Sequence, residues 1–217
     1  EIHKLVIPKG KKVFIVGESG IGKSTVLETL GMMNKTIVAD QTAKFWFYED
    51  ENHYIDLAHL WSCPDNELSA FRLKHFSFIF QSTNLMRNFT AFENIALTRM
   101  LQGYSMESSF AKTREVLADL GLDHIDETRM THELSGGQQQ RVAVARAIAA
   151  QPPIILADEP TGNLDSKSTI EIMNILKDLH KSGRTVIIIT HDDEIANQVD
   201  RVVRIMDGKI VSDSVNP

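Results

Sequence analysis

The stretch GESGIGKST, residues 17–25, decides the fold class of this chain. It follows the apolar run VFIV and leads into STVLETLGMM, which has the spacing of a helix. Because glycine carries no Cβ atom, the loop can turn its backbone N–H groups inward and form an anion-binding concavity. The helix that follows adds unpaired N–H groups and the positive end of its dipole. A strand, a glycine-rich loop and a helix in this order predict a phosphate-binding loop.

The end of this loop completes the pattern G-x-x-x-x-G-K-S. Lys23 can reach the β- and γ-phosphates of a nucleotide, and the Ser24 hydroxyl is placed for Mg²⁺. The alternative is a glycine-rich turn that only caps a structural helix, but the flanking strand and helix favour nucleotide binding. The predicted nucleotide-binding residues of the loop are Gly17, Glu18, Ser19, Gly20, Ile21, Gly22, Lys23, Ser24 and Thr25.

The composition is that of a soluble globular protein, with 217 residues in one domain or in a domain with an inserted lobe. The net charge of −6 argues against a broad nucleic-acid-binding surface, which needs clustered Lys and Arg. Cys63 is the single cysteine, which excludes an internal disulfide and fits a reducing, cytosolic compartment. No apolar run approaches the ~20 residues of a membrane span. The chain opens at Glu1 close to a strand-like segment, so we expect an upstream strand to be missing.

Short apolar runs alternate with helical patterns along most of the chain. Residues 3–7 and 11–16 are predicted strands around the turn PKG, and residues 36–57 are typical of partly exposed antiparallel strands. A buried strand is predicted at residues 76–80, amphipathic helices between residues 89 and 126, and a long helix at 138–151. Two further strands are predicted at 153–158 and 184–190, with a helix at 166–183 between them. The chain closes with a predicted hairpin at 201–212, whose turn is Asp207-Gly208.

Continuous apolar strands that alternate with helices indicate an α/β fold with a mostly parallel sheet covered on both faces. The helical block in the middle of the chain interrupts this alternation. We therefore predict a single domain over residues 1–217, in which residues 1–84 and 152–217 form a phosphate-loop core with a small antiparallel β portion. A helical lobe at about residues 85–151 is inserted into this core.

Two adjacent carboxylates follow the buried strand in IILADEP. Open α/β sheets bind ligands at the carboxyl ends of their strands, which is where Asp158 and Glu159 are expected to lie. Asp158 suits Mg²⁺, which takes oxygen ligands and needs only one or two protein carboxylates. Glu159 is then free to orient or deprotonate a water that attacks the γ-phosphate. In isolation the pair would be interpreted as a helix cap, but the phosphate loop in the same chain favours the catalytic interpretation.

The segment LSGGQ, residues 134–138, again places a serine and glycines before a long helix. This pattern is typical of an anion-binding site at a helix N-terminus, and it is equally typical of a serine that only caps the helix. Since residues 17–24 already form one phosphate cradle, a second one is useful if it closes over a nucleotide held by another copy. That interpretation predicts a head-to-tail dimer with two shared sites.

GESGIGKST, LSGGQ, IILADEP and ITHD, in this order, strongly resemble the nucleotide-binding subunit of ATP-binding-cassette (ABC) transporters. The resemblance covers essentially the whole chain, and the combination with LSGGQ is highly specific. LSGGQQQRVAVARAIA and DEPTGNLDS are most similar to the subgroup that serves lipoprotein release, macrolide efflux and cell-division complexes. The resemblance implies the ABC ATPase fold, with ATP and Mg²⁺ as ligands.

The resemblance assigns roles to further residues at matching positions. Gln81 resembles the Q-loop glutamine, which contacts Mg²⁺ or water and links the two lobes, and His191 resembles the switch histidine that contacts the γ-phosphate. Alone, His191 would be interpreted as a surface histidine. The predicted catalytic residues are Lys23, Glu159 and His191, and the predicted Mg²⁺ ligands are Ser24, Gln81 and Asp158.

Other matching positions are implied to act across a dimer. Four residues of the signature LSGGQ are expected to close on the γ-phosphate bound by the opposite subunit, and the D-loop is expected to cross the dimer seam. The signature residues are Ser135, Gly136, Gly137 and Gln138, and the D-loop residues are Asn163, Leu164 and Asp165.

The implied function is the ATP-hydrolysing motor of a membrane transporter, bound to a separate permease at the cytoplasmic face of the membrane. The alternative is a soluble ABC ATPase that acts on nucleic acid or ribosomes. Repair-type members carry long heptad arms between the phosphate loop and LSGGQ, and translation-type members carry two cassettes, and this sequence has neither. A passive ATP-binding module is disfavoured because Glu159 and His191 are both in place. No nucleic-acid partner is expected, and the cargo and the direction of transport stay unassigned.

The family's usual adenine-stacking aromatic upstream of the first strand has no candidate here, and the aromatic-rich residues 44–54 have no assigned role. Beyond Gln81, the segment STNLMRNFTAFENI offers apolar side chains near the junction of the lobes. We expect some of them to form a groove that receives a short cytoplasmic helix of the permease; the alternative is that all of them fill the lobe's core. These side chains are Leu85, Met86, Phe89 and Phe92.

Overall fold

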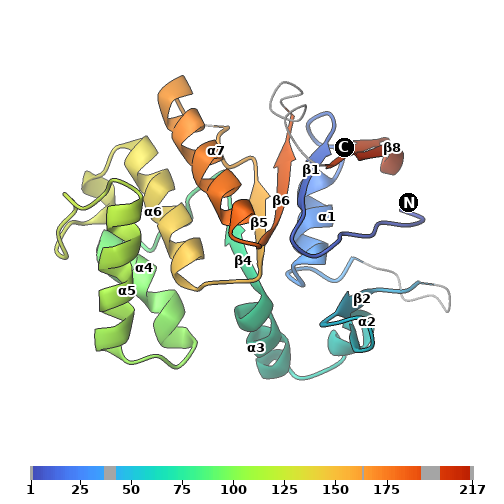
Figure 1. Ribbon diagram of the computed structural model, residues 1–217, viewed down its shortest axis with the longest axis horizontal. Helices are drawn as coiled ribbons and strands as arrows, with labels where there is room; N and C mark the ends of the chain where they lie inside the picture. The colour runs from blue at the N-terminus through green and yellow to red at the C-terminus, as the bar shows by residue number, and fades with distance from the viewer. Residues whose placement is uncertain (1, 37–42, 163, 192–200, 216–217) are drawn as a thin grey trace.

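A computed structural model of the protein describes residues 2–36, 43–162, 164–191 and 201–215. Its centre is a six-stranded sheet in the order β4-β5-β6-β1-β7-β8 (Figure 1). The five strands from β4 to β7 pair in parallel, and β8 pairs with β7 in the antiparallel direction. The strands are β1 (Lys12–Val16), β4 (Phe76–Ile79), β5 (Ile154–Asp158), β6 (Thr185–Thr190), β7 (Arg201–Met206) and β8 (Lys209–Val215). The predicted α/β fold with a mostly parallel sheet is confirmed.

The sheet is covered on both faces because successive side chains of a strand point to opposite sides. Phe14 and Val16 of β1 belong to a cluster with residues of α6 (Gly136–Ala149) and α7 (Ser166–Lys181). Val13 and Ile15 of the same strand belong to a second cluster with residues of α1 (Lys23–Leu30). Each of these four side chains is at most 1% exposed. The continuous apolar strands thus carry two cores, as expected for a parallel sheet.

A third apolar cluster holds the helical block together. It joins α4 (Ala91–Leu101), α5 (Met106–Asp119) and α6, with a short 3-10 helix, η1 (Thr131–Glu133), just before the start of α6. Figure 1 shows these helices grouped at the left, on the side of the molecule away from α1 and β1. Among the residues that the structure describes, none of the helices combines the length and the apolar character that crossing a membrane requires.

The aromatic-rich segment forms a two-stranded hairpin of β2 (Trp46–Tyr48) and β3 (Tyr54–Asp56). Phe47 points toward the core and packs against Phe71 and His75, with ring centroids 5.3 and 4.6 Å away. Trp46 and Tyr54 lie on the outer face, with their ring centroids 5.3 Å apart. Such cross-strand aromatic pairs stabilise a hairpin. The segment that the sequence left without a role therefore has a structural one.

The closing hairpin confirms its predicted turn. Asp207 and Gly208, between β7 and β8, have φ angles of 50° and 70°. Positive φ at both central residues matches the type I′ turn, whose twist suits the two flanking strands.

Three sequence predictions differ from the structure. Residues 3–7 form no strand, because both edges of β1 are already paired with β6 and β7. Two helices were missed, the short α2 (Leu57–Leu60) and α3 (Asp65–His75). The signals for α3 were the acidic residues of its first turn and the basic residues of its last, which complement the helix dipole. Helix α5 begins five residues before the predicted segment AKTREVLADLGL, because Ser105 caps it by accepting a hydrogen bond from the Ser108 N–H.

Candidate active site

The loop between β1 and α1 wraps around the side chain of Lys23. Its ammonium donates hydrogen bonds to the carbonyl oxygens of Gly17 and Glu18 at 2.8 and 2.6 Å, and the residue is 5% exposed. A Cβ atom on Gly17 would lie 2.3 Å from the Ile205 carbonyl oxygen, so only glycine fits there. Gly22 begins α1 with a φ of 95°, in the left-handed region that glycine adopts without strain. The loop thus holds a buried positive charge at the start of a helix, which suits a phosphate group.

Asp158, at the end of β5, lies beside the start of α1. Burial raises the pKa of its carboxyl group, a hydrogen bond with Ser24 works in the opposite direction, and the negative charge of Glu159 raises the pKa further. A carboxylate and a hydroxyl are the oxygen donors that Mg²⁺ prefers, and a bound cation would favour the charged carboxylate. The residues present therefore fit a Mg²⁺ ion held by Asp158 and Ser24.

The raised pKa predicts a pH dependence of stability. Because the pKa of Asp158 is higher in the folded than in the unfolded chain, its contribution to stability is present at acid pH and is lost as the pH rises through the folded pKa. Asp158→Asn removes this charge. Without nucleotide, we expect the melting temperature of the variant, relative to the original protein, to increase as the pH rises above about 4, the usual pKa of an aspartate. Melting curves by circular dichroism test this, and a difference independent of pH would contradict it.

Glu159 and His191 form a pair at the ends of the neighbouring strands β5 and β6. The Nδ1 atom of His191 lies 3.1 Å from Oε1 of Glu159, and their side chains are 60% and 18% exposed. Glu159 has a φ of 43°, which is costly for a residue other than glycine. Its N–H donates to the Ile189 carbonyl at 3.0 Å, which holds the backbone in this conformation. A carboxylate that is oriented by an imidazole is suited to accept a proton.

Gln81, two residues beyond the end of β4, reaches the same edge of the sheet. A Cβ atom on Gly162 would lie 2.9 Å from Nε2 of Gln81 and 3.4 Å from Oε2 of Glu159. The absence of a side chain at Gly162 therefore lets the amide approach the carboxylate. The structure brings the phosphate loop, Asp158, Glu159, His191 and Gln81 to one edge of the sheet, as the strand order β4-β5-β6-β1 requires.

The segment LSGGQ lies apart from the phosphate loop of the same chain. Figure 1 shows the start of α6 on the left of the molecule and the loop that leads into α1 on the right. A Cβ atom on Gly137 would lie 2.8 Å from Oγ of Ser168, so the segment packs beside the start of α7. Asp165 caps that helix by accepting a hydrogen bond from Ser168 N–H at 3.0 Å. This bond is the main cause of the lowered pKa of Asp165. Asn163, the predicted D-loop neighbour, lies outside the described residues.

Ser135 is the N-cap of α6, so the structural alternative for LSGGQ is present. Its hydroxyl accepts from Gln138 N–H at 3.3 Å, and Oε1 of Gln138 accepts from Ser135 N–H at 2.9 Å. This capping box uses the Ser135 oxygen as an acceptor and leaves its O–H to donate. Ser135 and Gly136 are exposed. The cap therefore does not prevent the segment from donating to an anion.

Sequence reasoning missed Gln140, which is 3% exposed on α6. Its side-chain Nε2 donates to the carbonyl oxygens of Phe80 at 3.1 Å and Pro160 at 2.9 Å. A signal was available, because Gln140, Val144 and Ala147 lie on one helical face at spacings of four and three residues, and the latter two belong to the apolar core. A polar residue in an apolar stripe indicates a buried polar contact.

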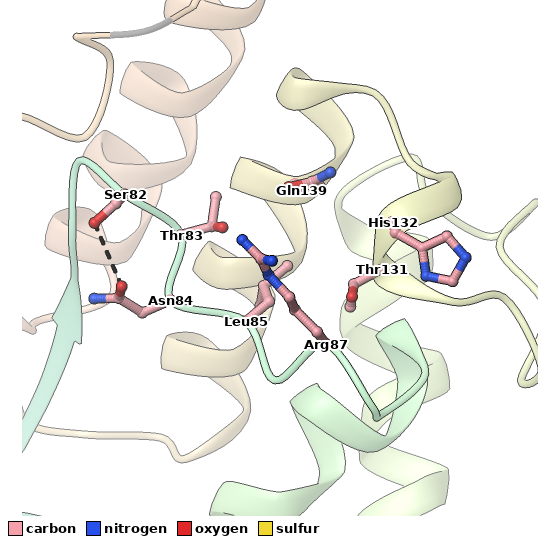
Figure 2. Close-up of a pocket in the computed structure, with 8 residues that line it drawn as sticks. All are labelled: Ser82, Thr83, Asn84, Leu85, Arg87, Thr131, His132 and Gln139. Carbon is pink, nitrogen blue, oxygen red and sulfur yellow. Dashed lines mark hydrogen bonds between the residues drawn. The ribbon is translucent and has the colours of Figure 1, made fainter.

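A pocket of about 500 Å³ lies where the segment after Gln81 meets α6 and η1. It is lined by Ser82, Thr83, Asn84, Leu85, Arg87, Thr131, His132 and Gln139. Figure 2 shows Arg87 pointing into it between Thr83 and Gln139.

Of the four side chains from which a groove was predicted at this junction, two are exposed. Phe92 is 2% exposed and fills the core of the helical block, and Leu85 packs partly against the same cluster. Met86 and Phe89 are 48% and 37% exposed. Of the eight residues that line the pocket, all but Leu85 are polar or charged. The predicted apolar surface is thus limited to Met86 and Phe89, beside a polar pocket.

Comparisons with known proteins agree with this geometry. A family model described as ABC transporter matches residues 2–162. The macrolide export ATP-binding/permease protein MacB of Hyphomonas neptunium is 43% identical over 215 residues, covering 98% of this chain and 31% of that protein. MacB of Bartonella henselae is 40% identical over 213 residues, covering 98% of this chain and 30% of that protein. This chain thus spans about 30% of the length of these curated relatives.

Solved structures also match over nearly the whole chain. The ATP-binding cassette MJ0796, in a dimeric post-hydrolysis state bound to ADP and Pi, has a TM-score of 0.83 and 37% identity, covering 97% of this chain and 88% of that one. The protein cbiO1 of Clostridium perfringens, part of the ABC transporter complex cbiONQ, has a TM-score of 0.79 and 25% identity, covering 97% of this chain and 79% of that one.

Proposed function

The chain belongs to the ABC transporter family, and from this premise we propose that it is an ATP-binding and ATP-hydrolysing cassette that drives a permease. The observation that carries the proposal is the convergence of Lys23, Asp158 and the Glu159–His191 pair at one edge of the sheet. The relatives favour a transporter over an ATPase that acts on nucleic acid or ribosomes, since their names join an ATP-binding part to a permease. We place the cassette at the cytoplasmic face of a membrane.

The chemistry follows from the residues at this edge. Lys23 and the backbone N–H groups of residues 17–24 hold the β- and γ-phosphates. Asp158 and Ser24 would hold Mg²⁺, which neutralises charge on the phosphate oxygens when it is bound. Glu159 orients the attacking water and accepts its proton. His191 keeps the Glu159 carboxylate in place through Nδ1, and its exposed ring can approach the γ-phosphate. Gln81, at the same edge, would contact Mg²⁺ or the attacking water.

The site is completed by a second copy of the chain. Ser135 and Gly136, at the start of α6, are exposed. Figure 1 shows the start of α6 on the left of the molecule and the loop that leads into α1 on the right. We infer that Ser135 and Gly136 donate to the γ-phosphate bound by a partner cassette in a head-to-tail dimer, with Asp165 near the seam. The dimeric state of the related cassette MJ0796 supports this arrangement.

Ser135→Arg tests the shared site. The bulky cation should block closure and lower the turnover by about 10- to 100-fold, because donors to the developing charge are lost. ATP binding by a single chain should persist, since residues 17–24 are unchanged. Mixing this variant with Lys23→Ala should restore one of the two composite sites and part of the activity. Light scattering with MgATP measures closure, and full dimerisation of Ser135→Arg would overturn the shared-site model.

The permease is expected to dock at the pocket beside Gln81. Met86 and Phe89 offer exposed apolar surface on the segment that contributes to the pocket, and Arg87, between them in the sequence, lines the pocket and offers charge. In the complete transporter, Met86→Ser with Phe89→Ser should abolish the stimulation of ATPase activity by the permease. The isolated cassette should keep its fold, because substitutions of exposed residues change stability by about 0.5 kcal/mol or less. Transport assays and melting curves test this, and a collapse of the melting temperature would instead favour a core role for the two residues.

A further inference from the structure

Gln140 connects three segments that meet at the catalytic edge. Its amide nitrogen donates to the carbonyl oxygen of Phe80, the residue before Gln81, and to that of Pro160, the residue after Glu159. The amide group has two N–H hydrogens, and these two bonds use both of them. Because Gln140 is 3% exposed, an amide left unpaired there would be destabilising. A displacement of α6 must therefore carry both carbonyl groups along or break these bonds.

Arg146, farther along α6, holds the other side of Gln81. Its guanidinium donates to the carbonyl oxygens of Thr83 at 2.9 Å and Asn84 at 2.8 Å. The backbone before and after Gln81 is thus bonded to the same helix. The segment that carries Gln81 and the helix that begins at Ser135 are fastened to each other.

The bond to Pro160 has a second consequence, because Glu159 has a strained backbone. A residue other than glycine near a φ of 43° is strained, and it keeps this conformation only where its surroundings hold it there. On one side of this residue, its own N–H donates to Ile189 of β6. On the other side, Gln140 holds the Pro160 carbonyl. Loss of the second restraint allows the Glu159 carboxylate to move away from His191.

We propose that Gln140 is a positioning residue that couples the position of α6 to the backbones of Gln81 and Glu159. This inference rests on the proposed function. When the start of α6 closes on the nucleotide of the partner cassette, the Gln140 amide transmits the position of the helix to the catalytic carboxylate. Gln140 acts through the Phe80 and Pro160 carbonyl groups and is not itself a catalytic residue.

The test replaces the amide by a thioether of similar length. Gln140→Met removes both hydrogen bonds and keeps the volume, and Gln102→Met is the matched control. The Gln102 amide also bridges two carbonyl groups, those of Leu73 and Ala150 at 3.2 and 3.0 Å, but these lie outside the catalytic edge. Each variant loses two hydrogen bonds, so both should be less stable in thermal unfolding. Only Gln140→Met should lower kcat, by about 10- to 100-fold, since a small misplacement of a reacting group has effects of that size.

The split between binding and turnover separates positioning from general damage. The affinity of a single chain for an ATP analogue should change by no more than about twofold, because the phosphate loop is intact. Gln140→Asn is the second variant; its amide is one methylene shorter and cannot hold both carbonyl groups, so kcat should fall in the same way. An unchanged kcat in both variants, or equal losses of kcat in Gln140→Met and Gln102→Met, would overturn the proposal.

A double-mutant cycle with Glu159→Gln identifies the residue through which Gln140 acts. If Gln140 positions the Glu159 carboxylate, adding Gln140→Met to Glu159→Gln should lower single-turnover hydrolysis by no more than about twofold. Fully additive losses would overturn this coupling. If the unaltered protein shows no ATPase activity at all, the proposed function fails instead, so the two failures are distinguishable.

Discussion

Glu159→Gln is expected to lower ATP turnover by about 10²–10⁴-fold, which is the usual contribution of a positioned general base. The amide keeps the size and the hydrogen-bonding ability of the side chain but cannot accept the proton of the attacking water. The phosphate loop, Ser24 and Asp158 are unchanged, so ATP binding should persist. Phosphate release in the steady state measures the loss.

The same variant should accumulate as an ATP-bound dimer. Removal of a negative charge next to the triphosphate eases repulsion in the closed state, while the slow turnover prevents opening. Size-exclusion chromatography should show the dimer with MgATP and the monomer with ADP. Asp158→Asn is the control, because it weakens Mg²⁺ binding and should give no trapped dimer. Near-normal hydrolysis by Glu159→Gln would refute the role of Glu159 as the base.

Lys23→Ala should abolish tight MgATP binding. The ammonium is 5% exposed and is held within the loop by the carbonyl oxygens of Gly17 and Glu18. Hydrogen bonds to charged groups contribute about 1.5–3 kcal/mol each, so the loss of two such contacts to the phosphates predicts an affinity at least about 100-fold lower. Titration with a fluorescent ATP analogue measures this change.

Lys9→Ala is the matched control for this prediction. Lys9 is exposed in the turn before β1, outside the phosphate loop. Its removal should leave the affinity unchanged and shows the effect of one lost surface charge. If Lys23→Ala binds the analogue as tightly as Lys9→Ala does, the loop is only structural.

The sequence by itself determined the elements whose signals are local. The phosphate loop follows from glycines and a lysine within a few residues, and the Asp207-Gly208 turn follows from two residues that tolerate positive φ. The buried strands follow from continuous apolar runs. The positions of Asp158, Glu159 and His191 at one edge follow from a general rule, because each comes at the carboxyl end of an apolar strand and such ends meet in a parallel sheet.

Only the tertiary structure decided which surfaces those elements meet. Residues 3–7 have a strand-like pattern but find no free edge beside β1. Phe92 and Phe89 are three residues apart in one apolar pattern, yet one fills the core and the other is exposed. Gln140 has significance only because the ends of β4 and β5 both come within reach of its amide. Each of these outcomes depends on contacts between residues far apart in the chain. A local pattern can indicate that a residue such as Gln140 is buried, but it does not identify the residues that it meets.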